Sequence, residues 1–461
     1  MRTPWKSWGS DRGNLETGDN IRALHTQLLI QRFTLPLAKP TVIGYLRYNT
    51  QQEAYAINVL FLSPGYPAEM AEFTRGLAQC GAQVIGLGEH PVDHLPTVAR
   101  QNLSHYIRVP SLVDGDSVLA TVRESSAHFT IDRVECLWEP FMTLAAQLRE
   151  MLDIEGMHTA QTELFRDKKK MKDALDAAGL RTPRNMIATG SDAIRAAATK
   201  IGLPLVIKPI DGAGSAHTHE VRDQGGLEIA VSDVGEHRKV SVEEYIEGEE
   251  YTYDTVCANG EIFYENIAWY RPKPIIGRNV EWISMQTVNL RNPERPELAV
   301  GLELGRRVIE TLGFRTGFTH MEWFLTPTGE AVFGEIGGRP PGGRSVDLMN
   351  YSNDFDIYKG WAEAVTRGEF NQVAHRRYNA AAIFKRARGQ GRISAIHGLG
   401  GLRHRYGEHI VVEELLSIGE PRRNWRQTLL SDGYLVVRHP ELAQTLEMAD
   451  AVGTDLQIDA S

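Results

Sequence analysis

The sequence predicts an α/β protein of more than one domain, and three observations support this. An apolar run at 57–62, a helical stretch at 68–80 and a second apolar run at 83–87 follow one another. A strand, helix and strand in this order form a βαβ unit, which predicts a parallel sheet. Two further apolar runs, at 320–324 and 332–336, flank a Pro-Thr-Gly turn and predict a hairpin. The length of 461 residues allows about three domains.

The parallel sheet is expected to continue with a strand at 132–138 and a helix at 141–152. No Gly-x-Gly-x-x-Gly follows the first strand, so a dinucleotide site is not indicated. Residues 1–50 are weakly patterned, and we interpret them as an N-terminal extension of unknown role.

Composition disfavours several classes of binding partner and indicates where the protein is located. The formal net charge of -9 argues against a nucleic-acid binder. Cys80, Cys136 and Cys257 lie far apart, which disfavours disulfides or a zinc site and fits a reducing compartment. The sequence has neither a long apolar span nor a signal-peptide core, so we expect no membrane partner and a cytoplasmic location.

The hairpin carries the most informative residues. Glu322 and Glu335 are the only acids inside its two apolar runs. Carboxylates on neighbouring strands repel unless a cation lies between them, and magnesium prefers such oxygen ligands. Arg339, four residues after Glu335, offers a planar fork for a carboxylate or phosphate. The alternative is an exposed hairpin with two solvated acids.

Basic residues in two other segments suggest a phosphate site. A lysine-rich stretch at 165–172 opens a helix that ends at Gly179, although such a run can also be a solvated face. Lys208 stands in an apolar strand at 205–209, directly before a small-residue turn at 211–216 that backbone N–H groups could use to bind phosphate. His217 and His219 alternate on the next strand, where a structural role is the commoner one.

A third segment, at 240–252, has the pattern of a strand that runs into a turn at Gly248. Backbone groups at such a strand end can contact a purine edge, and Glu250 can accept hydrogen bonds from ribose hydroxyls. Taken alone, this acidic segment is a weak signal, because acidic surface strands are common.

Together and in this order, these motifs resemble the ATP-grasp superfamily, of the carboxylate–amine ligase type, over residues 159–349. The resemblance implies a Rossmann-like domain at 51–155, an α+β ATP-grasp domain at 156–375 and a small C-terminal subdomain at 376–461 that completes the module. Arg388 to Gly391 and a late strand at 433–438 belong to that last part.

The resemblance also implies roles for single residues. Phosphate contacts are implied for two lysines and the mobile loop, adenine and ribose contacts for the strand end, metal binding for the hairpin acids, and activation of the substrate carboxylate for Arg339. The residues concerned are Lys168 and Lys208; Gly212, Gly214 and Ser215; Glu243, Tyr245, Ile246 and Glu250; and Glu322 and Glu335. Lys208 and Arg339 are the expected catalytic residues, ATP the nucleotide, and Mg²⁺ the metal, with Mn²⁺ as an alternative.

Two positions depart from related patterns. Many members have an asparagine ligand where this chain has Gly337, which leaves open how many metal ions bind. Biotin carboxylases place a glutamate base where this chain has Gly343, so bicarbonate is less favoured as the substrate.

The implied activity joins a small carboxylate to an amine through an acyl phosphate, releasing ADP and phosphate. The alternatives are an ATP-grasp kinase, a thiol ligase or a non-catalytic ATP sensor. Arg271, His320 and Arg344 are candidate substrate contacts. The basic, proline-rich segment 269–278 should not be a plain core strand; it either lines the substrate pocket or is a surface loop. Neither the substrates nor the oligomeric state can be read from the sequence, although dimers are common in this family.

Overall fold

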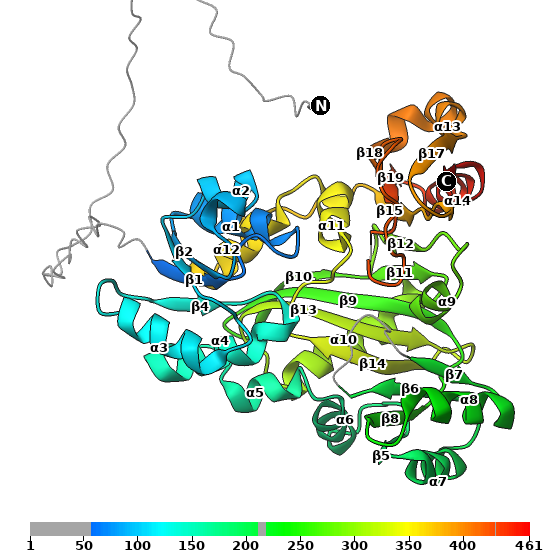
Figure 1. Ribbon diagram of the computed structural model, residues 1–461, viewed down its shortest axis with the longest axis horizontal. Helices are drawn as coiled ribbons and strands as arrows, with labels where there is room; N and C mark the ends of the chain where they lie inside the picture. The colour runs from blue at the N-terminus through cyan, green and yellow to red at the C-terminus, as the bar shows by residue number, and fades with distance from the viewer. Residues whose placement is uncertain (1–56, 211–217, 429) are drawn as a thin grey trace, which may run out of the picture. The chain divides into compact units, whose positions relative to one another are not determined.

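The computed structural model describes residues 57–210, 218–428 and 430–461, which belong to one compact unit, Tyr55–Ser461 (Figure 1). The prediction for residues 1–50 and the glycine turn at 211–216 fall outside these residues. Within them, no helix is both long and apolar enough to cross a membrane.

The first layer is a parallel sheet with strand order β3-β2-β1-β4. The β1 strand is almost wholly buried and pairs with β2 and β4, as its unbroken apolar run predicts. The elements of this region are β1 Asn58–Leu62, α1 Met70–Gln79, β2 Gln83–Gly88, η1 Val92–His94, α2 Thr97–Gln101, β3 His105–Arg108, α3 Gly115–Ser125, β4 Arg133–Glu135, η2 Glu139–Phe141 and α4 Met142–Leu152.

Two helices follow, α5 Thr159–Leu164 and α6 Lys168–Ala177. Asp167 caps α6 by accepting hydrogen bonds from the backbone N–H groups of Lys169 and Lys170. The lysines of this run lie on two faces of the helix. Lys168 and Lys172, one turn apart, are buried, whereas Lys170 lies on the exposed face. The solvated-face interpretation therefore holds for Lys170 but not for Lys168 and Lys172, whose proposed phosphate role stays a prediction.

A small antiparallel sheet comes next, with order β5-β8-β6-β7. Its helices α7 and α8 bury an apolar cluster against it. The elements are β5 Asn185–Thr189, α7 Ser191–Ile201, β6 Leu205–Pro209, β7 His219–Val221, α8 Gln224–Val234 and β8 Lys239–Glu244.

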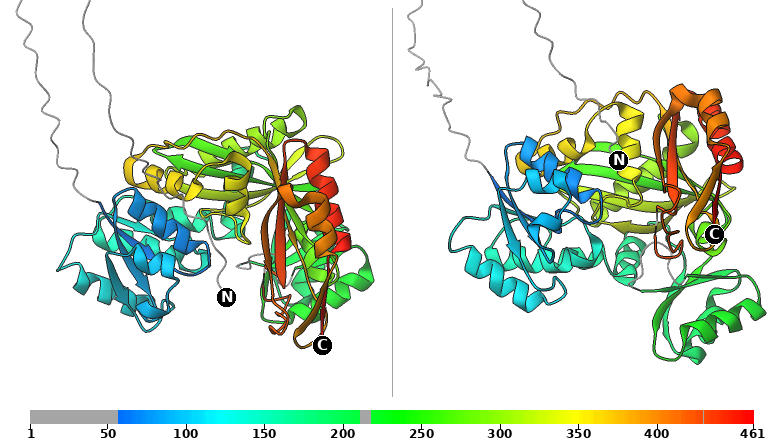
Figure 2. Two further views of the ribbon diagram at one scale, coloured as in Figure 1. Left: turned by 90° about the horizontal axis from the view of Figure 1, so that it is seen from above. Right: turned by 45° about the horizontal axis from the view of Figure 1, so that its top comes forward.

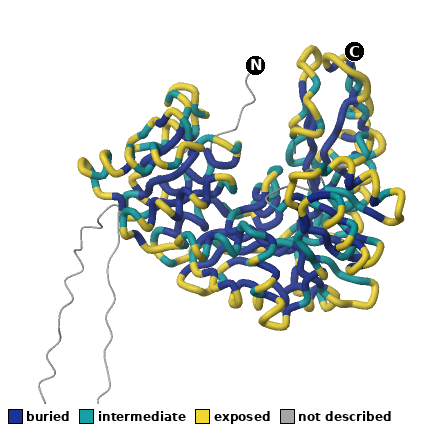
Figure 3. Tube along the Cα trace, turned by 60° about the horizontal axis from the view of Figure 1, so that its bottom comes forward, coloured by how far each residue is buried: buried dark blue, intermediate teal, exposed yellow. Residues whose placement is uncertain are grey.

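The central sheet has nine strands in the order β14-β13-β9-β11-β12-β15-β19-β18, with β10 paired to β9. Its strands are β9 Glu249–Ala258, β10 Glu261–Asn266, β11 Ala268–Arg271, β12 Gln286–Asn289, β13 Gly317–Leu325, β14 Ala331–Gly337, β15 Asn379–Phe384, β18 Ile410–Leu415 and β19 Gly433–His439. Figure 3 colours the chain by burial, and most residues of these strands are buried. Because β15, β18 and β19 belong to it, the sheet continues across residue 375, where the sequence suggested a boundary.

Helices cover the central sheet. Two glycines of α10 let it approach closely, since a Cβ on Gly301 would lie 2.1 Å from the Trp323 ring. Figure 2 shows α14 beside β15 and β19. The remaining elements are α9 Pro274–Asn279, η3 Pro296–Leu298, α10 Ala299–Thr311, α11 Ser345–Asn353, α12 Ile357–Arg367, α13 Leu399–Tyr406, η4 Gly407–His409, α14 Leu442–Asp455, and the three-stranded sheet of β16 Arg388–Gly389, β17 Ile393–His397 and β20 Gln457–Ala460.

The segment 269–278 was expected not to be a plain core strand, and it divides into two parts. Its first residues end β11, which pairs with β9 and β12 in the central sheet, and its last residues belong to α9. Alternation of side chains across the strand accommodates aromatic and basic residues there, because only one face must be buried. The proline-rich remainder turns into α9.

The parallel sheet is attached to the rest of the unit through α1 and α12. Phe73 of α1 is fully buried and packs edge to face against Tyr358 and Trp361, with ring centroids 4.8 and 5.1 Å apart.

Replacing Phe73 with alanine should therefore lower the free energy of unfolding by about 3–5 kcal/mol, because it leaves a cavity between two layers. Urea unfolding measures the effect. Ile229→Ala, at a side chain that is 65% exposed, is the matched control and should change stability by less than about 0.5 kcal/mol. Equal losses in both variants would show that this contact is not a structural joint.

Candidate active site

The hairpin of β13 and β14 places its two carboxylates opposite each other. Glu322 and Glu335 are direct partners in the antiparallel register. Side chains of such a pair project from the same face of the sheet, about 5 Å apart at Cβ. A register shift beyond this pair leaves Gly334 as the extra residue, where a Cβ would meet the Glu322 carbonyl oxygen at 2.8 Å. The two acids of the sequence motif thus face one place.

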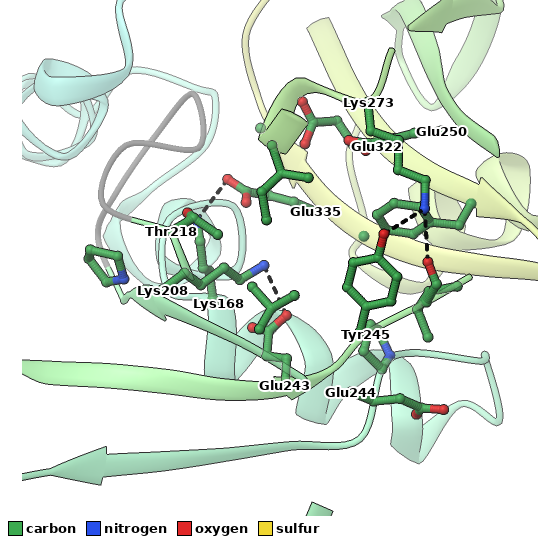
Figure 4. Close-up of a pocket in the computed structure, with 18 of the residues that line it drawn as sticks. Lys168, Lys208, Thr218, Glu243, Glu244, Tyr245, Glu250, Lys273, Glu322 and Glu335 are labelled. Carbon is green, nitrogen blue, oxygen red and sulfur yellow. Dashed lines mark hydrogen bonds and ion pairs between the residues drawn. The ribbon is translucent and has the colours of Figure 1, made fainter. Parts of the chain in front are cut away.

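Lysines from two other elements meet these acids. Lys168 Nζ of α6 lies 2.8 Å from Glu335 Oε1. Lys208 Nζ of β6 lies 2.9 Å from Glu243 Oε2, as Figure 4 shows. Burial opposes ionisation of Glu335, but Lys168 and Lys208 outweigh it and lower the pKa of Glu335 to about 2. Glu335 therefore stays charged despite its burial.

Lys172, which sequence reasoning missed, completes the lysine set. Its Nζ lies 2.5 Å from Glu243 Oε1, and its side chain is only 1% exposed. Burial lowers the pKa of Lys172 to about 8, although Glu243 favours the charged form. Its i, i+4 spacing from Lys168, on the apolar face of the helix, was the signal available in the sequence.

Glu243 was expected at the adenine hinge, but the structure places its carboxylate between Lys172 and Lys208. The two ammonium groups hold the pKa of Glu243 below its usual value even though burial acts in the opposite direction. The side chain of Glu243 therefore fixes the positions of the two lysines, and its role at an adenine hinge stays a prediction.

Those residues form one wall of a cavity. Tyr245, Ile246 and Glu250 line it, together with Lys273 and Phe324 from the central part of the chain. Lys273 Nζ donates to the Ile246 carbonyl oxygen at 3.2 Å and lies 4.8 Å from the centre of the Tyr245 ring. Burial and then the charge of Glu322 raise the pKa of Glu250 well above its usual value.

Arg339 reaches the same cavity and pairs with a residue of the first layer. Its Nη2 and Nε lie 2.7 and 2.9 Å from Glu139 Oε2, and Arg166 contacts the other oxygen of Glu139. Asp347, an acid close to Arg339 in the sequence, pairs with Arg344. The pairing partner of Arg339 lies 200 positions earlier in the chain and could not be read from local spacing.

Gly337, at the end of β14, also lines the cavity. A Cβ there would lie 3.3 Å from Cγ of Arg339. The missing side chain at this departure from the family pattern thus leaves room for the stem of the arginine.

Of the three candidate substrate residues, only His320 lines either cavity. His320 lines the cavity, and its Nδ1 lies 2.6 Å from Asp254 Oδ1. Burial disfavours its charged form, but hydrogen bonds to Asp254 and Glu322 raise the pKa of His320 to about 9. Arg271 instead pairs with Asp450, and Arg344 pairs with Asp347 and donates to the Tyr434 hydroxyl. Neither arginine is among the lining residues of the two cavities described here.

The glycine loop was predicted to hold phosphate through Gly212, Gly214 and Ser215, and these residues lie outside the described ranges. His217 lies outside them too, whereas His219 is described in β7, 4.0 Å from Asp233. Thr218, which follows the loop, lines the cavity.

The charges of the side chains that line the cavity indicate whether ATP needs a metal ion there. Its described lining contains six glutamates against five basic side chains: Glu139, Glu243, Glu244, Glu250, Glu322 and Glu335 against Lys168, Lys208, Lys273, Arg339 and His320. A triphosphate adds more negative charge, so it needs a counter-cation here. Among the described residues, no group of three or more His, Cys, Asp or Glu side chains is arranged to hold an ion. Two carboxylates that share an ion with phosphate oxygens fit magnesium.

A second cavity adjoins the first, and the two share Glu139, His320, Glu322 and Arg339 as lining residues. Most of its other walls are apolar. Tyr270, Pro272 and Pro274 contribute to it, so part of the segment 269–278 lines a pocket and is not a free surface loop.

Comparison with known proteins agrees with this geometry. Residues 165–265 match the model of the ATP-grasp domain family. The L-arginine-specific L-amino acid ligase of Bacillus subtilis is 27% identical over 244 residues, which cover 50% of this chain and 58% of that protein. A formate-dependent phosphoribosylglycinamide formyltransferase of Synechocystis is 26% identical over 302 residues, covering 62% of this chain and 71% of that protein.

The solved structures give the same fold. The L-amino acid ligase of Bacillus licheniformis aligns with a TM-score of 0.70 at 19% identity, covering 87% of this chain and 98% of that one. Residues 165–265 thus match the ATP-grasp domain family, and the expected α/β fold class is confirmed.

Changing Glu335 to glutamine should abolish ATP turnover while the protein stays folded, because the variant loses an ionic ligand and no core volume. ADP release and circular dichroism measure the two effects. Glu330→Gln in the same hairpin, where the side chain is 51% exposed, is the control and should retain activity. Near-normal ADP release by both Glu335→Gln and Glu322→Gln would remove the metal assignment.

Changing Lys208 to methionine should weaken ATP binding at least about tenfold, which corresponds to roughly 1.4 kcal/mol of charge-assisted contact. Titration calorimetry with ATP and Mg²⁺ measures it. Lys200→Met, on the exposed end of α7, is the control. Unchanged affinity in Lys208→Met would restrict Lys208 to its structural pairing with Glu243.

Proposed function

We propose that this chain is an ATP-dependent carboxylate–amine ligase that forms an amide or peptide bond through an acyl phosphate. The observation that carries this proposal is that Glu322 and Arg339 line both cavities, while Glu335, the partner of Glu322 in the hairpin, lines the first. One cavity is lined by lysines suited to phosphates, and the other is mostly apolar. Such an arrangement brings a phosphoryl donor and a second substrate to the same carboxylate pair.

In the first cavity, Lys168 and Lys208 bind the phosphates of ATP, with Lys172 and Glu243 holding Lys208 in place. Gly212, Gly214 and Ser215 lie outside the described residues, and their phosphate contacts stay a prediction from the sequence. Tyr245 and Ile246 contact the adenine, and Glu250 accepts from the ribose hydroxyls. Each role fits the chemistry of the side chain or backbone group concerned.

Glu322 and Glu335 would hold Mg²⁺, or Mn²⁺ in its place, which neutralises charge on the transferred phosphoryl group. His320 donates to Asp254 and is oriented toward Glu322, so it fixes the position of that ligand. Lys168 plays the corresponding part for Glu335.

The reaction takes place in two steps. An oxygen of the substrate carboxylate, held by Arg339, attacks the γ-phosphorus of ATP, and the bond to the bridging oxygen breaks to release ADP. The amine then attacks the carbonyl carbon of the acyl phosphate, phosphate leaves, and the amine nitrogen loses a proton. Arg339 favours both steps because its planar fork matches a carboxylate and then the acyl phosphate.

The L-amino acid ligase name of two relatives makes amino acids the first substrates to test. The proposed setting is the cytoplasm, since Cys80, Cys136 and Cys257 are buried free thiols, as expected in a reducing compartment.

The direct test incubates the protein with ATP, Mg²⁺, a mixture of amino acids and hydroxylamine. Hydroxylamine captures an acyl phosphate as a hydroxamate, so the expected products are ADP and hydroxamate together. ADP without hydroxamate would indicate a kinase, and ATP binding without ADP release would indicate a sensor. Either result overturns the ligase proposal.

Changing Arg339 to lysine should keep ATP affinity but remove most carboxylate-dependent ADP release, because an ammonium group cannot form the same two-pronged contact. The structural alternative is that Arg339 only ties Glu139 to the hairpin. In that case the variant melts at a lower temperature but keeps its hydroxamate yield in the cold. Arg166→Lys is the matched control, since Arg166 contacts the same glutamate but is not among the residues that line either cavity.

A further inference from the structure

Glu69, directly before α1, is a buried carboxylate on the wall of the second cavity. Glu69 is only 6% exposed and is among the residues that line this cavity. Its Oε1 accepts a hydrogen bond from the backbone N–H of Arg344 at 2.9 Å. Across the residues that the structure describes, no lysine, arginine or histidine side chain forms an ion pair with it.

This combination is unusual for a buried acid, because an ionised carboxylate needs a cation or several donors when it leaves water. The guanidinium of Arg344 is occupied by Asp347 and by the Tyr434 hydroxyl. The two other carboxylates that line the second cavity do have cationic neighbours: Glu139 pairs with Arg339, and Glu322 lies 3.7 Å from Nε2 of His320. Glu69 therefore has one carboxylate oxygen available to a cationic ligand in the cavity.

The rest of the wall indicates what else the ligand carries. Met70, Leu137, Trp138, Tyr270, Met285 and Phe384 surround the cavity with apolar surface. Such a lining favours an apolar side chain and disfavours a charged one. At the boundary with the first cavity, Arg339 offers the contact for a carboxylate.

Resting on the ligase function proposed above, we propose that Glu69 binds the protonated amino group of the substrate whose carboxylate is activated, and that this substrate is an amino acid with an apolar side chain. Arg339 binds its carboxylate, and the apolar wall receives its side chain.

The negative charge of Glu69 also determines whether this substrate is the carboxylate donor or the attacking amine. A carboxylate beside an amino group favours the ammonium form. An ammonium group has no lone pair and cannot attack an acyl phosphate. The amino acid held by Glu69 is therefore the carboxylate donor, and the attacking amine comes from the other substrate.

The test compares the binding of amino acids with that of the same acids lacking the amino group. Leucine, methionine and phenylalanine, and their deaminated counterparts, are titrated into the protein with Mg²⁺ and a non-hydrolysable ATP analogue. The wild-type protein should bind at least one of the amino acids at least about tenfold more tightly than its counterpart, as expected for a buried charge pair. Aspartate and lysine should bind more weakly than any of the three.

Glu69→Gln should lose this preference, while its affinity for the deaminated acids stays the same. The amide oxygen still accepts from the Arg344 N–H, so the melting temperature should change little. Glu89→Gln is the matched control, because Glu89 likewise accepts a backbone N–H, from Leu112, but is not among the residues lining the cavity. If Glu69→Gln does not fold, the affinities of the wild-type protein for the amino acids and for their deaminated counterparts still test the proposal.

The proposal is overturned if none of the three amino acids binds, if the wild-type protein does not distinguish them from their counterparts, or if Glu69→Gln keeps the preference. These outcomes are separate from failure of the ligase proposal. That failure shows as ATP hydrolysis or binding without hydroxamate, whatever the titrations give.

Discussion

Burying charge near the hairpin is the constraint on which this site depends. Glu243 and Lys172 are both almost fully buried. The free-energy cost of burying either charge is offset by the opposite charge beside it. Lys208 joins the same carboxylate, and Lys168 joins Glu335. These residues come from α6, the small antiparallel sheet and the central sheet. The ion pairs therefore fix the relative positions of three structural elements as well as the charges that a triphosphate would meet.

Local pattern accounts for most of what the sequence predicts correctly. The hairpin of Glu322 and Glu335, the strand of Lys208 and the start of the lysine helix are each encoded within a few residues, by alternation, turns and caps. The first βαβ unit is encoded in the same way. The segment 269–278 combines the half-buried end of β11 with the start of α9, so it lacks the continuous apolar run of a strand buried on both faces.

The missed contacts are those that depend on tertiary packing. Nothing near Arg339 in the sequence points to Glu139, and nothing near Glu69 points to the backbone of Arg344. Arg271 and Arg344 show the converse, since a basic residue close to a motif can be taken up by an acid from a distant helix or strand. Lys172 lies between these cases: its helical spacing from Lys168 was visible, but its partner on β8 was not.

Gly337 shows how one absent side chain can restrict later change. The stem of Arg339 passes 3.3 Å from where a Cβ would be, and its guanidinium is tied to Glu139 and to the carbonyl oxygen of Pro340. The arginine therefore cannot easily move aside for a larger neighbour. We therefore expect positions 337, 339 and 139 to be coupled: a larger side chain at 337 requires the arginine to take another path, and that path depends on a residue in the first layer. A substitution of the glycine is consequently constrained by two positions that are distant from each other in the sequence.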